Sequence, residues 1–500
     1  MELTHVFTCA IIGEGTLPLQ CAEILLGRGH TICAVISPDQ LLARWATEHN
    51  IPCAATPASL PELVGKQSFD YLFSIVNYQV LPGEVLAAPR KWAINYHDAP
   101  LPRYAGSYAT SWALMAGERA HAVTWHLMTE QVDAGDILQQ LAVEIGPGET
   151  ALTLNAKCYD AALRAFAALV DDLAGGQARP LPQNLAERTF FARARRPAGG
   201  CTLSWEADAE ALAALVRALQ FGPYPNPLGL PKIALGAEFV AATALDALDS
   251  RAGRPPGTIV SLGDDALIVA TATQDIALRE LLTIDGQPLP IAALAARLGL
   301  RAGDQLPMLD GERAGRLTTL YSRLCKHESF WVEQLAQFQP VGLPYAARAS
   351  GPAARHTYRL AIPTGVLEFL DGWPGDRAEL LLVAFAIYLA RLSSQSAFDI
   401  GLAEATLREE IGDLAGFFAT IVPLRITLDM GWSFEECAQR LGAWLAHARQ
   451  RRTYARDTIA RYPVLRDLPE LHSAGPWPVA VAVGPLPPHP PAPSPTRREG

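Results

Sequence analysis

The residues best suited to chemistry lie in one short segment, 95–106, which reads NYHDAPLPRYAG. It follows residues 92–94, an apolar run that predicts a buried strand. Because side chains alternate along a strand, Asn95 and His97 should point to the same face of the sheet. An amide donor and an imidazole placed side by side at the end of a strand could converge on one carbonyl oxygen.

A later segment supplies a carboxylate that could complete this site. Residues 123–127 predict another strand, which leads into the loop MTEQVDAGD at 128–136. Asp133 on this loop could orient the imidazole of His97 or take up the proton that an attacking amine releases. A single histidine is usually structural and a D-A-G-D sequence usually forms a turn, so it is the combination that indicates a catalytic site.

The order of these motifs, N-x-H, then L-P-R-Y-x-G, then D-x-G-D, resembles the folate-dependent formyltransferases. That family includes the methionyl-tRNA, glycinamide ribonucleotide and amino-sugar formyltransferases. The resemblance implies that Asn95, His97 and Asp133 are catalytic, and that an amine attacks the formyl carbon of 10-formyltetrahydrofolate without a metal. Asn95 and protonated His97 would stabilise the oxyanion, and Asp133 would hold the imidazole and assist proton transfer.

The same resemblance implies where the folate binds. A main-chain segment holds the pterin ring in the family, and a second loop runs beside the folate. The implied positions here are Gln79, Val80, Leu81 and Thr129. Many members carry a proline or a small residue and then a serine after the histidine, where this chain has Asp98 and Ala99. In this respect the chain is closer to formylation domains attached to nonribosomal peptide synthetases.

The elements that must position these residues alternate between apolar runs and helical patterns. The runs are at 6–12, 32–36 and 71–75, and the helical patterns are at 19–27 and 41–49. This alternation predicts a doubly wound, Rossmann-like α/β domain over residues 1–185. Gly13 and Gly15 follow the first run, but Pro18 stands where a dinucleotide fingerprint needs its third glycine. We therefore expect a strand-to-helix turn that binds no nucleotide.

Two further units follow the α/β domain. Residues 175–200 are rich in Gly, Pro and Arg and predict a linker, whose arginines (188, 193, 195 and 196) we interpret as a solvated face. Short strands at close spacing then predict a small β-barrel, OB-like, over 198–300, which also resembles the family's C-terminal domain. The expected strands are at 232–235, 238–241, 258–262, 266–270 and 276–282, after a helix at 207–219.

Residues 320–484 resemble the C-terminal lobe of peptide-synthetase condensation domains, an α+β half-domain. The matching segments are 328–335, 398–401 and 412–425. Condensation chemistry in that family needs adjacent histidines in H-H-x-x-x-D-G, and no two histidines after residue 300 are adjacent. We therefore expect a docking or spacer unit without the catalytic lobe. The Pro-rich end, 485–500, predicts a disordered tail, and the abrupt change there is typical of a fragment.

Composition narrows the class of partner. With 41 Lys+Arg against 51 Asp+Glu the formal net charge is −10, which opposes docking of a phosphate backbone. The eight cysteines are scattered, which is typical of a cytosolic protein, and no secretory signal opens the chain. The longest apolar stretch, 380–390, predicts a buried helix that is too short to span a bilayer. We expect a cytoplasmic enzyme whose partners are an aminoacyl-carrier protein or the adenylation and carrier domains of a synthetase.

Three functions stay open at this point. The first is formylation of a carrier-tethered aminoacyl starter in nonribosomal peptide synthesis. The second is a stand-alone formyltransferase that acts on methionyl-tRNA, an amino sugar or another small amine. The third is a catalytically idle scaffold whose last unit binds other proteins.

Overall fold

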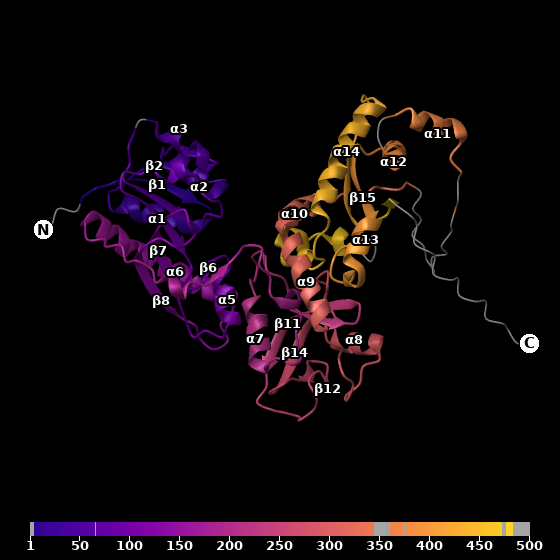
Figure 1. Ribbon diagram of the computed structural model, residues 1–500, viewed down its shortest axis with the longest axis horizontal. Helices are drawn as coiled ribbons and strands as arrows, with labels where there is room; N and C mark the ends of the chain where they lie inside the picture. Colours follow the sequence, from indigo (N-terminus) through magenta and orange to yellow (C-terminus); the bar gives the residue numbers. More distant parts are fainter. Residues whose placement is uncertain are drawn as a thin grey trace, which may run out of the picture.

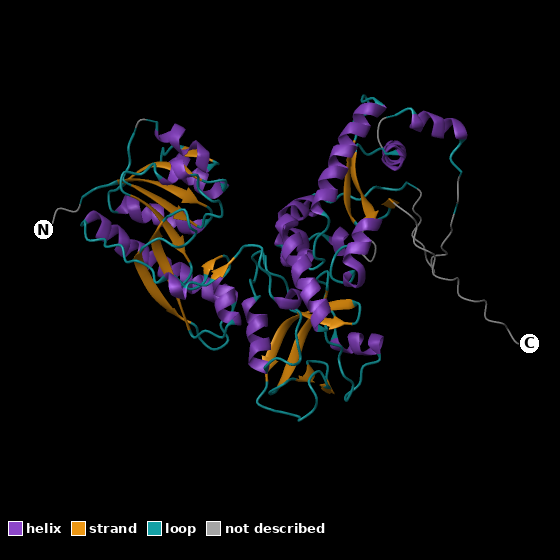
Figure 2. Cartoon of the chain, in the orientation of Figure 1, coloured by secondary structure: helices purple, strands orange, loops and turns teal. Residues whose placement is uncertain are grey.

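A computed structural model describes residues 5–65, 67–344, 358, 361–373, 376–472 and 477–483 (Figure 1). Along the chain it forms an α/β unit, an antiparallel sheet unit and a largely helical unit (Figure 2). The Pro-rich segment predicted to be disordered lies outside the described residues. Among the residues described, no helix combines the length and the apolar character that crossing a membrane requires.

The first unit is built on a seven-stranded sheet with strand order β3-β2-β1-β4-β5-β7-β8. The first five strands in this order are parallel, and β7 and β8 run antiparallel to their neighbours. The predicted Rossmann-like sheet is therefore confirmed, with an antiparallel edge added to it. The strands are β1 (Thr8–Gly13), β2 (Thr31–Ile36), β3 (Cys53–Ala54), β4 (Tyr71–Ile75), β5 (Trp92–His97), β7 (Ala120–Leu127) and β8 (Ile137–Glu144).

Helices pack against this sheet through their apolar faces. The longest, α6, buries one apolar face against β7 and β8, where the Phe166 ring lies 4.7 Å from the ring of Trp125. This face follows the 3.6-residue period of an amphipathic helix. The helices of the unit are α1 (Thr16–Gly27), α2 (Gln40–Glu48), α3 (Leu60–Val64), α4 (Gly83–Leu86), α5 (Ala109–Met115) and α6 (Ala151–Ala174).

The predicted linker is a structured connector. Its strand β9 (Phe190–Phe191) pairs in parallel with β6 (Ala105–Gly106), which lies within the segment that holds the candidate catalytic residues. The connector therefore lies on the first unit before the chain enters the second.

The second unit is a five-stranded antiparallel sheet with strand order β10-β11-β14-β13-β12. It agrees with the expected OB-like unit in its number of strands. It is an open sheet rather than a closed barrel, because the edge strands β10 and β12 do not pair with each other. Its elements are α7 (Ala209–Ala218), β10 (Lys232–Leu235), β11 (Glu238–Ala247), β12 (Ile259–Leu262), β13 (Leu267–Ala270), β14 (Asp275–Thr283) and α8 (Ile291–Leu298).

The third unit surrounds a three-stranded sheet, β16-β15-β17, with helices. The helix predicted to be buried at 380–390 is α12, but it is only partly buried, since Phe385 and Tyr388 are exposed. The elements are α9 (Gly311–Leu324), α10 (Glu328–Ala336), α11 (Thr364–Asp371), α12 (Arg377–Ser393), β15 (Ala397–Glu404), α13 (Ala405–Ile411), β16 (Val422–Thr427), α14 (Phe434–Arg451), α15 (Thr458–Arg461), α16 (Pro463–Arg466) and β17 (Ala480–Val483).

A buried group of charges joins the second and third units. Lys232 Nζ of β10 lies 2.5 Å from Asp457 Oδ2, and Arg461 of α15 pairs with both Asp457 and Glu328. Arg461 also donates to the backbone oxygen of Asn226 in the second unit. All four charged side chains are at most 6% exposed, so the two units pack as one body around this cluster.

Candidate active site

Strand β5 carries the two residues that the N-x-H motif singles out. It extends to His97, three residues beyond the predicted run, so Asn95 and His97 both belong to the strand. The neighbouring strand β7 runs antiparallel to it, with Asn95 opposite His126 and His97 opposite Thr124. The strand pairing therefore fixes the backbone of both residues at one edge of the parallel part of the sheet.

The imidazole of His97 is buried and lies between two carboxylates. Its Nε2 donates to the backbone oxygen of Tyr104 at 2.9 Å and lies 3.9 Å from Asp133 Oδ2. Its Nδ1 lies 3.8 Å from Oδ1 of Asp98. Each ring nitrogen therefore lies within 4 Å of one carboxylate oxygen.

Asp133 reaches the site from the loop between β7 and β8. Its backbone is in the left-handed region, with φ 55°, and its buried Oδ2 accepts the N–H of Gly106 at 2.8 Å. Burial alone would raise the pKa of this carboxyl, but His97, His126 and the Gly106 N–H together lower it to about 2. Asp133 is therefore ionised at neutral pH.

A second histidine, His126 of β7, completes the group, and sequence reasoning missed it. Its Nε2 lies 3.2 Å from Asn95 Nδ2 and 3.5 Å from Asp133 Oδ1, while its Nδ1 contacts the backbone oxygen of Leu127 at 2.8 Å. The residue lies within a strand that the sequence predicted. Its place opposite Asn95 is set by the register of β5 and β7, which no local pattern reveals.

The segment after His97 is held by side chains from β7 and β8. His121 Nε2 contacts the backbone oxygen of Asp98 at 2.6 Å, and Thr124 donates to that of Ala99 at 2.6 Å. Gln140 donates to both Thr124 and the backbone oxygen of Leu101. Burial lowers the pKa of His121, so this imidazole is a neutral donor that positions the loop.

The connector fixes the Asp133 loop from the other side. Gln183 donates to the backbone oxygens of Asp133 and Gly135 at 3.0 and 2.6 Å, and Arg188 donates to that of Val132. The strand pairing also needs Gly106, because a Cβ there would lie 2.2 Å from the Phe191 oxygen. The connector thus takes part in building the site.

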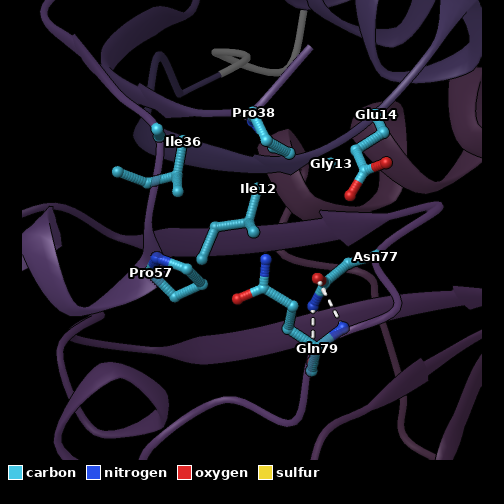
Figure 3. Close-up of a pocket in the computed structure, with 9 residues that line it drawn as sticks. Ile12, Gly13, Glu14, Ile36, Pro38, Pro57, Asn77 and Gln79 are labelled. Atoms are coloured by element: carbon cyan, nitrogen blue, oxygen red, sulfur yellow. Dashed lines mark hydrogen bonds between the residues drawn. The ribbon is translucent and has the colours of Figure 1, made fainter. Parts of the chain in front are cut away.

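The four residues proposed for the folate do not form one surface. They lie in the loop after β4 and in the loop after β7. The side chains of Gln79, Val80 and Thr129 are exposed, with Val80 at 86%, whereas Leu81 is buried in an apolar cluster. Asn77 closes the first loop through hydrogen bonds to the backbone of Gln79, as Figure 3 shows.

A pocket opens beside this loop, at the carboxyl ends of β1, β2 and β4 (Figure 3). This is the edge where doubly wound sheets place ligands. The N–H of Gly15, at the start of α1, is bonded to Oδ2 of Asp39 at 2.9 Å, and Glu14 lines the pocket. These two carboxylates oppose a phosphate at the helix N-terminus, in agreement with the absence of a dinucleotide fingerprint.

The comparison with protein families identifies two parts of the chain. Residues 52–170 match the family described as formyl transferase, and residues 199–299 match the formyl transferase C-terminal domain. In the described parts of the chain, no group of three His, Cys, Asp or Glu side chains could hold a metal ion.

Solved structures that resemble this chain include an N-formyltransferase from Helicobacter canadensis, in complex with folinic acid and dTDP-3-aminofucose. It is 15% identical, covers 55% of this chain and 99% of its own, and gives a TM-score of 0.45. HypX from Aquifex aeolicus, in complex with tetrahydrofolic acid, is 16% identical over 61% of this chain and 50% of its own, with a TM-score of 0.42. A 4-N formyltransferase from Francisella tularensis is 18% identical. The match covers 46% of this chain and 93% of that protein, with a TM-score of 0.39.

The family assignment depends on the two family matches and not on these structures. One match lies in the first unit and includes Asn95, His97 and Asp133, and the other lies in the second unit. The resemblance drawn from the motif around Asn95 and His97 is therefore confirmed. Residues 52–170 and 199–299 therefore match the two domains of the formyl transferase family, and these domains make the chain a formyltransferase.

Proposed function

We propose that this enzyme transfers the formyl group of 10-formyltetrahydrofolate to the amino group of a carrier-tethered aminoacyl starter in nonribosomal peptide synthesis, in the cytoplasm. The observation that carries the proposal is the convergence of Asn95, His97 and Asp133 from one strand and one loop. A carboxylate, an imidazole and an amide at one point suit transfer of an acyl group to an amine.

Each side chain has a distinct part in this reaction. Asn95 Nδ2 and His97 are the hydrogen-bond donors for the negative charge that develops on the formyl oxygen. In the structure they are engaged with the backbone oxygens of Tyr96 and Tyr104, so both must turn toward the substrate. Asp133, held by Gly106, keeps its charge next to the imidazole and assists the passage of the amine's proton to the tetrahydrofolate nitrogen, which leaves as its bond to the formyl carbon breaks.

The loop after β4 fits a planar donor such as the pterin ring. The backbone N–H and C=O groups of Val80 make no hydrogen bond within the described residues, and the Val80 side chain is exposed. Leu81 and Met128 belong to one apolar cluster, which links this loop to the one before Thr129. When bound there, the folate supplies the formyl group. The loop supplies free main-chain donors and acceptors to hold it.

A protein-bound acceptor is favoured by the third unit. Its packing onto the second unit around Lys232 and Asp457 makes it part of the enzyme body. We propose that it is a half-condensation-like unit without amide-forming activity, used for docking. The net charge of −10 weighs against a tRNA acceptor.

The test is formyl transfer by the full chain, with acceptors compared side by side. The panel is aminoacyl-carrier proteins, methionyl-tRNA and a nucleotide-linked amino sugar, each incubated with 10-formyltetrahydrofolate and read by mass. We expect a gain of one formyl group on the carrier-bound amine and none on the tRNA. Efficient transfer to tRNA that is lost between low and physiological salt would replace the proposal with the stand-alone function.

A further inference from the structure

Two arginines of the connector have no charged partner. Arg193 and Arg195 are exposed, and neither forms an ion pair or a side-chain hydrogen bond with any described residue. Burial and the charge of Asp39 raise the pKa of Glu14, and Arg193 acts against them without forming an ion pair with Glu14. In a chain with a net charge of −10, two neighbouring unpaired cations stand out.

Aromatic rings hold both guanidinium groups in place. The guanidinium of Arg193 lies 5.8 Å from the ring centre of Tyr78, and that of Arg195 lies 4.6 Å from Phe191 and 5.2 Å from Trp112. Cation–π contacts of this kind fix the orientation of an arginine and leave its outer N–H groups free. The pair is therefore prepared for an anion, with little side-chain entropy left to lose on binding.

The arginines lie beside the site rather than in it. The connector that carries them bonds to the Asp133 loop through Gln183, and Tyr78 belongs to the loop proposed for the folate. Tyr78 is 63% exposed, so an exposed aromatic side chain lies beside Arg193. Tyr and Arg are the residue types enriched in the cores of protein interfaces.

The third unit borders the same surface. The thiol of Cys325, just after α9, donates to the backbone oxygen of Ala194, between the two arginines. The next arginine, Arg196, is buried with its guanidinium 5.5 Å from the ring of Tyr321. The interpretation of all four connector arginines as a solvated face is therefore wrong for Arg196, whose burial depends on a unit distant in sequence.

We propose that Arg193 and Arg195, with Tyr78, form the docking surface for an acidic carrier domain that presents its tethered amine to Asn95, His97 and Asp133. This proposal rests on the proposed function and names the surface that selects the acceptor. A protein partner is favoured over RNA because two exposed cations fall far short of the roughly 6–10 phosphate contacts typical of nucleic-acid binding.

The experiment uses the full chain with Arg193→Glu and Arg195→Glu combined. Three quantities are measured: KM and kcat for the aminoacyl-carrier protein, the same constants for the aminoacyl group on a small thioester, and KM for 10-formyltetrahydrofolate. We expect KM for the carrier to rise at least about tenfold, because like charges would then face each other. The small-thioester constants and the donor KM should stay within about twofold of the wild type. The control is Arg254→Glu, an exposed arginine of the second unit without an ion pair, which should change none of them.

Other outcomes overturn the docking surface without affecting the function. A rise in the donor KM would assign the arginines to the folate's carboxylate tail, and an equal loss on the small thioester would place them in the active site. Unchanged carrier kinetics, or a matching loss on aminoacyl-tRNA, would also refute it. If the wild type formylated neither the carrier nor the thioester, the proposed function itself would fall. A charge reversal on the carrier that restores the double variant would complete the support.

Discussion

Two buried groups of charged side chains differ in how closely their members approach. Where the second and third units meet, Arg461 lies 2.5 Å from Glu328 and 3.0 Å from Asp457, with further bonds to neighbouring oxygens. In the active site, Asp133 lies 3.5 Å from His126 and 3.9 Å from His97. Both groups are buried, yet only in the first do the charged side chains bond directly to one another. We call the group around Arg461 the closed cluster and the group around Asp133 the open cluster.

The difference separates a structural cluster from a reactive one. A buried ion pair survives desolvation only when its donors and acceptors are satisfied, which is the condition around Arg461. A site for chemistry must leave room and bonding capacity for atoms that arrive later. The long contacts around Asp133 leave both. A buried aspartate thus supports packing in one group and chemistry in the other, and the distances to its neighbours distinguish the two roles.

Breaking the closed cluster should have the largest effect, on stability. Asp457→Asn would leave Lys232 buried without its carboxylate partner and Arg461 paired with Glu328 alone. We expect the free energy of unfolding to fall by about 3–5 kcal/mol, measured by urea denaturation. Rates per folded molecule should stay near wild type, because Asp457 lies outside the active site.

The matched control is Asp413→Asn. Asp413 pairs with Arg313 and Arg316 but is 51% exposed, so its loss should cost about 0–1 kcal/mol. Equal losses from the two substitutions would contradict the contrast between closed and exposed pairs.

Breaking the open cluster should affect rate instead. His97→Ala removes one donor to the developing oxyanion, so formyl transfer should fall by a factor of about 10²–10³. Folding and folate binding should change little, because the oxyanion forms only in the transition state. The measurement is single-turnover formyl transfer together with folate affinity. A variant with near-normal turnover would remove His97 from the mechanism.

Elements defined by local pattern could be predicted from the sequence. Strands β4 and β10 have the predicted bounds, and the alternation of runs and helices gave the parallel sheet. The long helix α6 was missed although its buried positions follow the helical period, so the signal was present there. The motif and the strand pattern also predicted that Asn95, His97 and Asp133 would lie close together.

Features fixed by contacts between distant segments could not be predicted. His126 joins the site through the register of β7 against β5, and a shift of one residue would turn it to the other face. The connector looked like a linker because its composition is that of a loop. Its order comes from pairing with β6 and from Gln183 bonding to the Asp133 loop.

Acid should weaken the open cluster in a defined range. The pKa of Asp133 is about 2 in the folded chain, below the roughly 3.9 of an unfolded aspartate. The charge of Asp133 therefore stabilises the fold at neutral pH, by about 2.6 kcal/mol, and this contribution is lost as pH falls from about 4 to 2. Urea unfolding of wild type and Asp133→Asn should show a gap at pH 7 that narrows below pH 4. A gap that does not change with pH would contradict the assigned pKa.

The smallest effect should come from His126, which contacts the site without a proposed bond to the substrate. Its Nε2 lies 3.2 Å from Asn95 Nδ2, so it orients the amide rather than the reacting atoms. His126→Ala should lower kcat by about tenfold, the equivalent of one neutral hydrogen bond, with the donor KM unchanged. His126→Gln keeps an acceptor and should recover part of that loss, which a purely structural residue would not show. A loss as large as that of His97→Ala would instead make His126 a donor to the oxyanion, and an unchanged kcat would leave Asn95 positioned by the backbone of β5 alone.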